Sequence, residues 1–299
     1  MPSSPDEVAD LLRGSVLDGR PVASISIPGE QEQALAVPCG AEEVLLAWRC
    51  VRRALERTQR WPVVVAGWGG PLGPDLFSRF PYDHGAGGET SVKAIVARAE
   101  NIQSDDVFAD WARVDDEWDA SEYLESFELR HTKDFVGEAP SAEEVRLALG
   151  ARPTHAELDR WLLDWEEARG SSRVETDSYL DWFEPTGIDV GVILLPTPHG
   201  WHALAFMSFF GAEGPGGAEK LIAVLRSWND RYGAELVAHY GTMLELQVGR
   251  PPRNVDEAWQ LAREQELVAQ CTTALPGIPL RHHARTLVGR SAWFLHERP

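Results

Sequence analysis

The sequence has little cysteine, no long apolar run and no basic leader. Cys39, Cys50 and Cys271 are an odd number of cysteines at unrelated spacings, which argues against a disulfide framework and favours a reducing compartment. No apolar stretch reaches the roughly 18 residues that a membrane-spanning helix needs. The first residues, MPSSPDEVADLL, are acidic where an export signal is basic. These absences predict a cytoplasmic protein without a membrane segment.

Motifs of common catalytic and cofactor sites are also missing. No Gly-x-Ser-x-Gly elbow occurs, and no Gly-x-Gly-x-x-Gly follows a strand. The stretch from Gly85 to Ser91 is glycine-rich but has Glu89 in the region where a phosphate-binding loop needs lysine. The histidines lack zinc-ligand spacing. The sequence therefore indicates no metal, no cofactor and no catalytic group, with a Cys271 nucleophile beside His282 or His283 as the alternative.

Negative charge is concentrated in one part of the chain. The formal net charge is −19, and residues 100–185 hold 24 Asp or Glu against 8 Lys or Arg, a net of −16 that leaves only −3 elsewhere. Such a field repels nucleic-acid phosphates and attracts a basic protein. The sequence thus predicts no nucleic-acid binding.

This acidic segment also has a helical apolar stripe. Val107, Trp111, Val114 and Trp118 recur at helical spacing. Further helices are predicted after the caps Ser141 and Thr154, and the second has a core stripe of Leu158, Trp161, Leu162 and Trp165. We predict an acidic aromatic surface for a basic partner, or, in the simpler interpretation, surface helices with a solvated acidic face. The candidate contact residues are Asp110, Trp111, Asp115, Asp116, Glu117 and Trp118.

The N-terminal region, residues 1–99, alternates helical and strand patterns. Residues 22–27 and 63–66 read as strands, and the first 40 residues are otherwise loosely patterned. Residues 41–57 have the spacing of an amphipathic helix. A glycine-rich loop occupies residues 67–88, and Thr90 is predicted to cap the next helix, with a weak anion site there as an alternative.

The C-terminal region, residues 187–299, is the most regular. Strands are predicted at 190–195 and 201–210, paired as a hairpin, and again at 236–239 and 243–248. A helix through Leu221 and Trp228 ends at Gly233, and Asn254 caps another. Together with an acidic helical segment at 100–186, these elements predict an α+β protein with a mixed, mostly antiparallel sheet and packed helices.

The region from Val190 onward resembles the family called domain of unknown function 4253, common in bacteria. The motifs that carry the resemblance are ILLP at 193–196, LRSW at 225–228, YGAELV at 232–237, LEL at 244–246, RPP at 250–252, DEA at 256–258 and LA-x-EQ at 261–265. The chain departs from the family at Cys271-Thr272-Thr273, where Cys-Pro-Asp is usual. The family has no established activity, so the resemblance implies a fold and no mechanism.

Three interpretations of the function follow from these patterns. The first is a protein-interaction module, immunity-like in its electrostatics because acidic inhibitors of basic toxins use the same attraction. The second is an enzyme or small-molecule binder with a pocket between the N- and C-terminal halves, lined by Trp201, His202, Trp228 and Glu264. A structural accessory whose acidity serves only solubility is the third interpretation. The patterns do not specify an oligomeric state.

Overall fold

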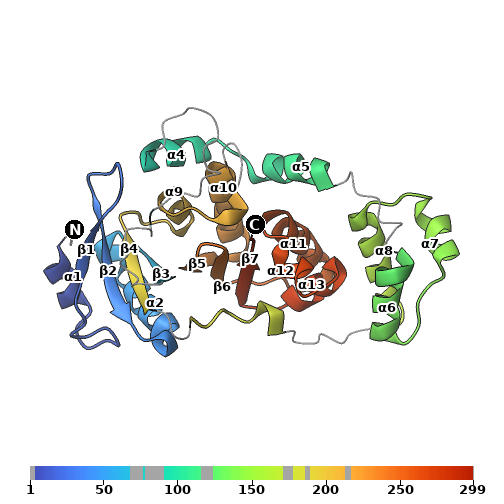
Figure 1. The fold of residues 1–299 in the computed structure, drawn as a ribbon, viewed down its shortest axis with the longest axis horizontal. Helices are drawn as coiled ribbons and strands as arrows, with labels where there is room; N and C mark the ends of the chain where they lie inside the picture. Colours follow the sequence, from blue (N-terminus) through green and yellow to red (C-terminus); the bar gives the residue numbers. More distant parts are fainter. Residues whose placement is uncertain are drawn as a thin grey trace. The chain divides into compact units, whose positions relative to one another are not determined.

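The chain forms two compact units, which we describe separately from a computed structural model (Figure 1). The structure describes residues 4–67, 77, 91–115, 124–170, 178–185, 189–212 and 217–298. Unit 1 comprises residues 1–104, 181–250 and 291–299, and unit 2 comprises residues 105–180 and 251–290. The units do not follow the three sequence segments, because the helices after residue 250 group with the acidic helices and the last strand returns to unit 1.

Unit 1 is built on a seven-stranded sheet in the order β1-β2-β4-β3-β5-β6-β7. All neighbouring strands are antiparallel except β3 and β5, which are parallel. The α+β class and the mixed, mostly antiparallel sheet are therefore confirmed. The strands are β1 (Ala23–Ser26), β2 (Gln33–Cys39), β3 (Trp61–Gly67), β4 (Asp189–Leu195), β5 (Ala234–His239), β6 (Met243–Val248) and β7 (Ala292–His296).

Helices cover both faces of this sheet. Arg52 of α2 bonds to Glu235 of β5, whereas the buried Trp228 of α10 packs edge-on against Trp293 of β7 with ring centroids 5.9 Å apart. Glu235 and Leu236 point to opposite faces, and the strand register places Trp293 on the face of Leu236. The helices of unit 1 are α1 (Pro5–Leu11), α2 (Val44–Arg53), α3 (Leu55–Thr58), α4 (Val92–Ala99), α9 (Ala203–Phe206) and α10 (Gly217–Tyr232), with 3-10 turns at Ala41–Glu43, Gly200–His202 and Phe210–Ala212.

The prediction of a strand over residues 201–210 is wrong. This segment forms a 3-10 turn at Gly200–His202 followed by α9, and β4 pairs with β2 and β3 instead. A short, continuous apolar run has the same pattern in a buried strand and in a buried helix. Gly200 also lies so close to the Trp61 indole that a Cβ atom there would be 2.6 Å from its ring carbons.

Strand β2 was missed because Pro38 lies within it and Ala34 and Ala36 are weak strand formers. The register explains how the proline is tolerated. Strand β1 pairs with β2 from Gln33 to Ala36, so Pro38 lies beyond that pairing. A proline there removes no ladder hydrogen bond on the β1 side.

Unit 2 is helical. Ser141 and Thr154 cap their helices through reciprocal hydrogen bonds with Glu144 and Glu157, as predicted. A small apolar core forms from Leu124, Val145, Leu158 and Leu162. The helices are α5 (Ser104–Asp115), α6 (Leu129–Val136), α7 (Ala142–Leu149), α8 (His155–Glu167), α11 (Val255–Val268), α12 (Cys271–Ala274) and α13 (Leu280–Leu287), with a π-turn at Leu124–Glu128 and a 3-10 turn at Ser178–Leu180.

The predicted helix ends and caps can also be compared with the structure. The cap of α4 is Ser91, whose hydroxyl accepts from the Ala94 amide; Thr90 and most of the 67–88 loop lie outside the described residues. The helix that ends at Gly233 and the helix capped by Asn254 are confirmed. Within the described ranges, no helix combines the length and apolarity needed to cross a membrane.

Candidate functional site

The predicted acidic aromatic surface begins on α5. Asp110 is exposed, whereas Phe108 is buried and Trp111 is half-buried, with their rings edge to face at 6.3 Å. The helix therefore has an apolar stripe and an acidic face, as the spacing predicts. Of the other candidate contact residues, Asp115 ends the helix, and Asp116, Glu117 and Trp118 lie outside the described residues.

The residues predicted to line a pocket lie in different environments. Trp201 and His202 are half-buried neighbours, and the Trp201 ring stacks on His199 at 4.6 Å. Trp228 has no exposed surface, so it is a core residue of unit 1. Glu264 is buried in α11 and belongs to unit 2. Trp228 therefore lines no surface pocket.

The alternative of a Cys271 nucleophile finds little support in the histidines. Both ring nitrogens of His283 are engaged, Nδ1 with the Tyr179 hydroxyl at 2.8 Å and Nε2 with the side-chain Oε1 of Gln265 at 3.0 Å. Burial lowers the pKa of His283 and of His282 to about 3. Neither imidazole is therefore suited to deprotonate a thiol near neutral pH.

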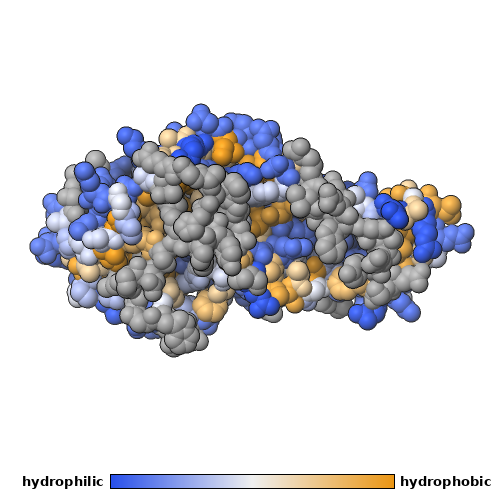
Figure 2. Space-filling model, turned by 45° about the horizontal axis from the view of Figure 1, so that its top comes forward, coloured by the Kyte–Doolittle hydropathy of each residue, from blue (hydrophilic) through white to orange (hydrophobic). Residues whose placement is uncertain are grey.

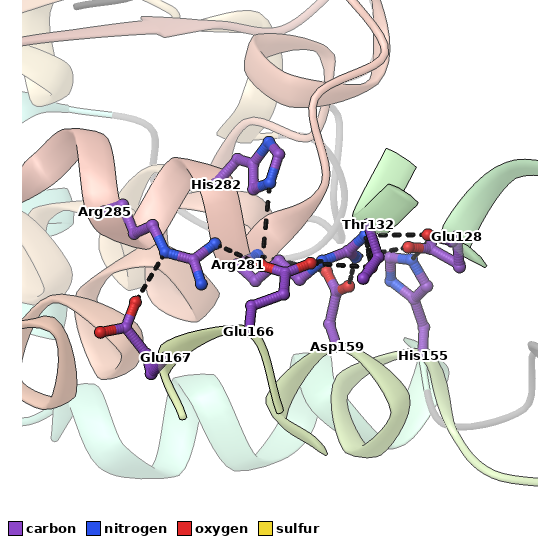
Figure 3. A network of polar contacts seen from close by, with 9 residues as sticks. All are labelled: Glu128, Thr132, His155, Asp159, Glu166, Glu167, Arg281, His282 and Arg285. Carbon is purple, nitrogen blue, oxygen red and sulfur yellow. Dashed lines mark hydrogen bonds and ion pairs between the residues drawn. The ribbon is translucent and has the colours of Figure 1, made fainter. Parts of the chain in front are cut away.

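The most elaborate polar arrangement is a buried ionic cluster around Arg281 of α13 (Figure 3). The Arg281 guanidinium donates to Glu128 at 2.5 Å, to Glu166 at 2.9 Å, and to Asp159. Its Nη2 also reaches the Thr132 hydroxyl and the Glu128 carbonyl, both at 3.2 Å. We call this the Arg281 cluster; its members are Glu128, Thr132, His155, Asp159, Glu166, Glu167, Arg281, His282 and Arg285.

Helix α8 supplies one side of the cluster from a single face. His155, Asp159, Leu162 and Glu166 follow one another at spacings of four, three and four residues, which places them in one row along the helix. Asp159 and Glu166 are fully buried. The available sequence signal was that these two acids fall within the apolar stripe rather than opposite it.

Charges inside the cluster shift one another. Burial opposes ionisation of Glu128, but hydrogen bonds from His155 and Arg281 and the Arg281 charge outweigh it and lower the Glu128 pKa to about 2. The same contact with Glu128 raises the pKa of His155 to about 9. Burial raises the pKa of Asp159 to about 6, and the Arg281 charge only partly offsets this. At neutral pH all three groups are therefore charged.

Arg285 extends the cluster by one turn of α13. Its guanidinium donates to Glu166 at 2.6 Å and to Glu167 at 2.9 Å, and lies 4.9 Å from the Phe135 ring centroid. Glu166 therefore bridges two arginines. Figure 3 shows both guanidinium groups reaching from α13 toward the carboxylates of α8.

The cluster behaves as a clamp between helices. Its buried carboxylates are bound by guanidinium groups, and the lowered pKa of Glu128 makes that carboxylate a poor proton acceptor. No group of three or more His, Cys, Asp or Glu in the described part of the chain is arranged to hold a metal ion. The arrangement ties α13 to α8 and to the turn at Glu128.

A surface pocket of about 540 Å³ lies in unit 2, between α8, α11 and the end of α7. Two indoles line it, those of Trp161 and Trp259, together with the cations of Arg160 and Arg263. The sequence pattern alone does not indicate this pocket. The spacing places Trp161 in a core stripe, and α11 begins almost ninety residues after α8 ends.

Unit 1 contains a separate buried carboxyl group, that of Glu245 on β6. It accepts a hydrogen bond from the backbone amide of Phe183, whose ring packs edge to face on Tyr240 at 5.4 Å. Burial raises the pKa of Glu245 to about 8 and also raises that of Tyr240. No described cation pairs with Glu245. Its carboxyl group is therefore mostly protonated at neutral pH.

Replacing Glu245 with glutamine is expected to stabilise the protein at neutral pH. A carboxyl whose pKa rises on folding from 4.5 to about 8 makes the unfolding free energy fall as pH rises through that range. Glutamine does not ionise, so Glu245→Gln should gain roughly 2–3 kcal/mol near pH 7 and flatten the pH dependence. Urea unfolding at several pH values measures this. The same slope in both proteins would show that Glu245 is already ionised in the fold.

Comparison with known proteins gives one family. Residues 191–296 match the model described as Domain of unknown function (DUF4253), which confirms the predicted resemblance. The matched residues contribute strands to unit 1 and helices α11–α13 to unit 2. No curated protein and no solved structure matches the chain. Over roughly its C-terminal third, the chain is thus similar to the DUF4253 family.

Proposed function

We propose that this protein is a protein-interaction module that binds a basic partner on the acidic surface of unit 2. The observation that carries the proposal is the placement of charge. Unit 2 contains 25 Asp or Glu against 13 Lys or Arg, a net of −12. Among its described residues, 11 exposed Asp or Glu face six exposed Lys or Arg.

The buried arginines of unit 2 pair with buried carboxylates, so they do not offset the excess of negative charge on its surface. Arg281 and Arg285 are buried on Glu128, Asp159 and Glu166. These arginines cannot neutralise the exposed acids of α5, among them Asp105, Asp106 and Asp110. In Figure 2, hydrophobic residues form separate patches between hydrophilic ones on the atoms that are coloured. A surface of this kind favours electrostatic rather than apolar association.

The cysteines support a cytoplasmic setting for this interaction. None of Cys39, Cys50 and Cys271 forms a disulfide. Burial raises the pKa of Cys39 to about 11, so its thiol is unreactive near neutral pH. Cysteines that form no disulfide suit a reducing compartment.

Binding of a labelled arginine-rich peptide, followed by fluorescence anisotropy, tests the proposal. Affinity should fall at least about 10-fold between low salt and roughly 0.3 M NaCl, because salt screens attraction between exposed charges. The triple variant Asp105→Asn, Asp106→Asn, Asp110→Asn should weaken binding several-fold at low salt.

A matched control distinguishes binding to the acidic surface of unit 2 from a general effect of the protein's net charge. Glu32→Gln, Glu42→Gln and Glu56→Gln remove the same charge from exposed positions of unit 1. This triple variant should bind the peptide almost as well as the original protein. Equal weakening by both triple variants, or binding indifferent to salt, would overturn the proposal.

A further inference from the structure

The pocket between Trp161 and Trp259 has the dimensions of a small-molecule site. Its volume of about 540 Å³ falls within the roughly 300–1,000 Å³ usual for such sites. Trp161 is half-buried and Trp259 is 9% exposed, so both indoles sit on a packed base. Aromatic walls of this kind favour a flat, apolar ligand body.

The charges around the pocket identify the second feature of the ligand. Arg160 is committed, because it donates to Asp164 at 2.9 Å and to Asp256 at 2.8 Å. Glu157 accepts from the Thr154 amide at 2.9 Å and from its hydroxyl at 3.0 Å, which completes the cap of α8. Three of the four charged groups that line the pocket therefore already have partners.

Arg263 of α11 is the exception. It lines the pocket, is half-buried, and makes no hydrogen bond or ion pair with the part of the chain that the structure describes. A guanidinium presents paired donors whose spacing matches the two oxygens of a carboxylate. A cationic ligand would find the two acids of the pocket already bonded and would be repelled by Arg263.

We propose that this pocket binds a small aromatic carboxylate, with its ring against the indoles of Trp161 and Trp259 and its carboxylate on Arg263. This site is separate from the acidic surface proposed above and takes a ligand of the opposite charge. Failure of one proposal therefore leaves the other intact.

Three probes that share the indole ring system but differ in charge test the inference by isothermal titration calorimetry. They are the anionic indole-3-acetate, the neutral indole-3-acetamide and the cationic tryptamine. The acetate should bind at least about 10-fold more tightly than the acetamide, because only the acetate forms a charged pair with Arg263. Tryptamine should bind most weakly.

Variants locate the site. Arg263→Gln should lower the affinity for the acetate at least about 10-fold and leave that for the acetamide unchanged, whereas Arg263→Lys should retain part of the preference. Arg130→Gln, at an exposed arginine of α6 outside the pocket, is the matched control. The inference is overturned if the acetate does not bind, if acetate and acetamide bind equally, or if Arg263→Gln has no effect.

Discussion

Replacing Arg281 with methionine is expected to lower the unfolding free energy of unit 2 by roughly 3–5 kcal/mol. The substitution removes the cation that Glu128, Asp159 and Glu166 share. Glu128 keeps His155 and Glu166 keeps Arg285, but the fully buried Asp159 carboxylate loses its ion-pair partner. Urea unfolding combined with hydrogen exchange of α8 and α13 measures the effect. Exchange should rise in both helices, because Arg281 links one to the other.

Two further variants test whether the unpaired buried charge causes this loss of stability. Arg253→Met removes an arginine that is 85% exposed and paired with Glu257, and should change stability little. Combining Arg281→Met with Asp159→Leu and Glu128→Leu should recover much of the lost stability, because buried ion sets are often replaceable by apolar side chains. If Arg281→Met lowers the unfolding free energy no more than Arg253→Met does, Arg281 does not hold α13 to α8.

Replacing Trp228 with alanine is expected to cost roughly 3–5 kcal/mol, because it empties a large site in the core of unit 1. Trp228 is 0% exposed and packs edge-on against Trp293, whose centroid is also 5.4 Å from the ring of Tyr232. Thermal and urea unfolding measure the loss. Trp228→Phe should cost less, since it keeps an aromatic ring against β7.

The control for this prediction is Trp201, which was predicted to line the same pocket as Trp228. Trp201 is half-buried and stacks on the exposed His199, so Trp201→Ala leaves a smaller cavity and should cost clearly less. Equal losses for the two variants would mean that Trp228 does not anchor α10 to the sheet. The comparison therefore tests the assignment of Trp228 to the core.

Local patterns predicted much of the fold because their causes are local. Ser141 and Thr154 cap helices through residues three positions away, and Gly233 ends α10 with a positive φ of 61°. Strands β5 and β6 and helix α11 lie where periodicity and capping place them. The strand prediction for residues 201–210 is wrong because a buried helix and a buried strand have the same apolar pattern.

The candidate sites were less visible because they depend on distant partners. Periodicity assigned Trp161 to a core stripe, yet its indole lines a pocket with Arg263, about a hundred residues later in the sequence. Asp159 and Glu166 read as acids on a surface helix, whereas Arg281 makes their burial favourable. Residue spacing within one helix does not indicate an ion pair between residues so far apart in the sequence.

The sequence by itself determined the class of the fold, the order of most elements, the resemblance of the C-terminal third and the excess of negative charge. These depend on composition, caps and side-chain period, which act within a few residues. Only the tertiary structure decided which charges are buried, that helices α11–α13 join the acidic helices, and that Trp228 is core. Those outcomes depend on long-range packing, where a buried charge is tolerated only beside its partner.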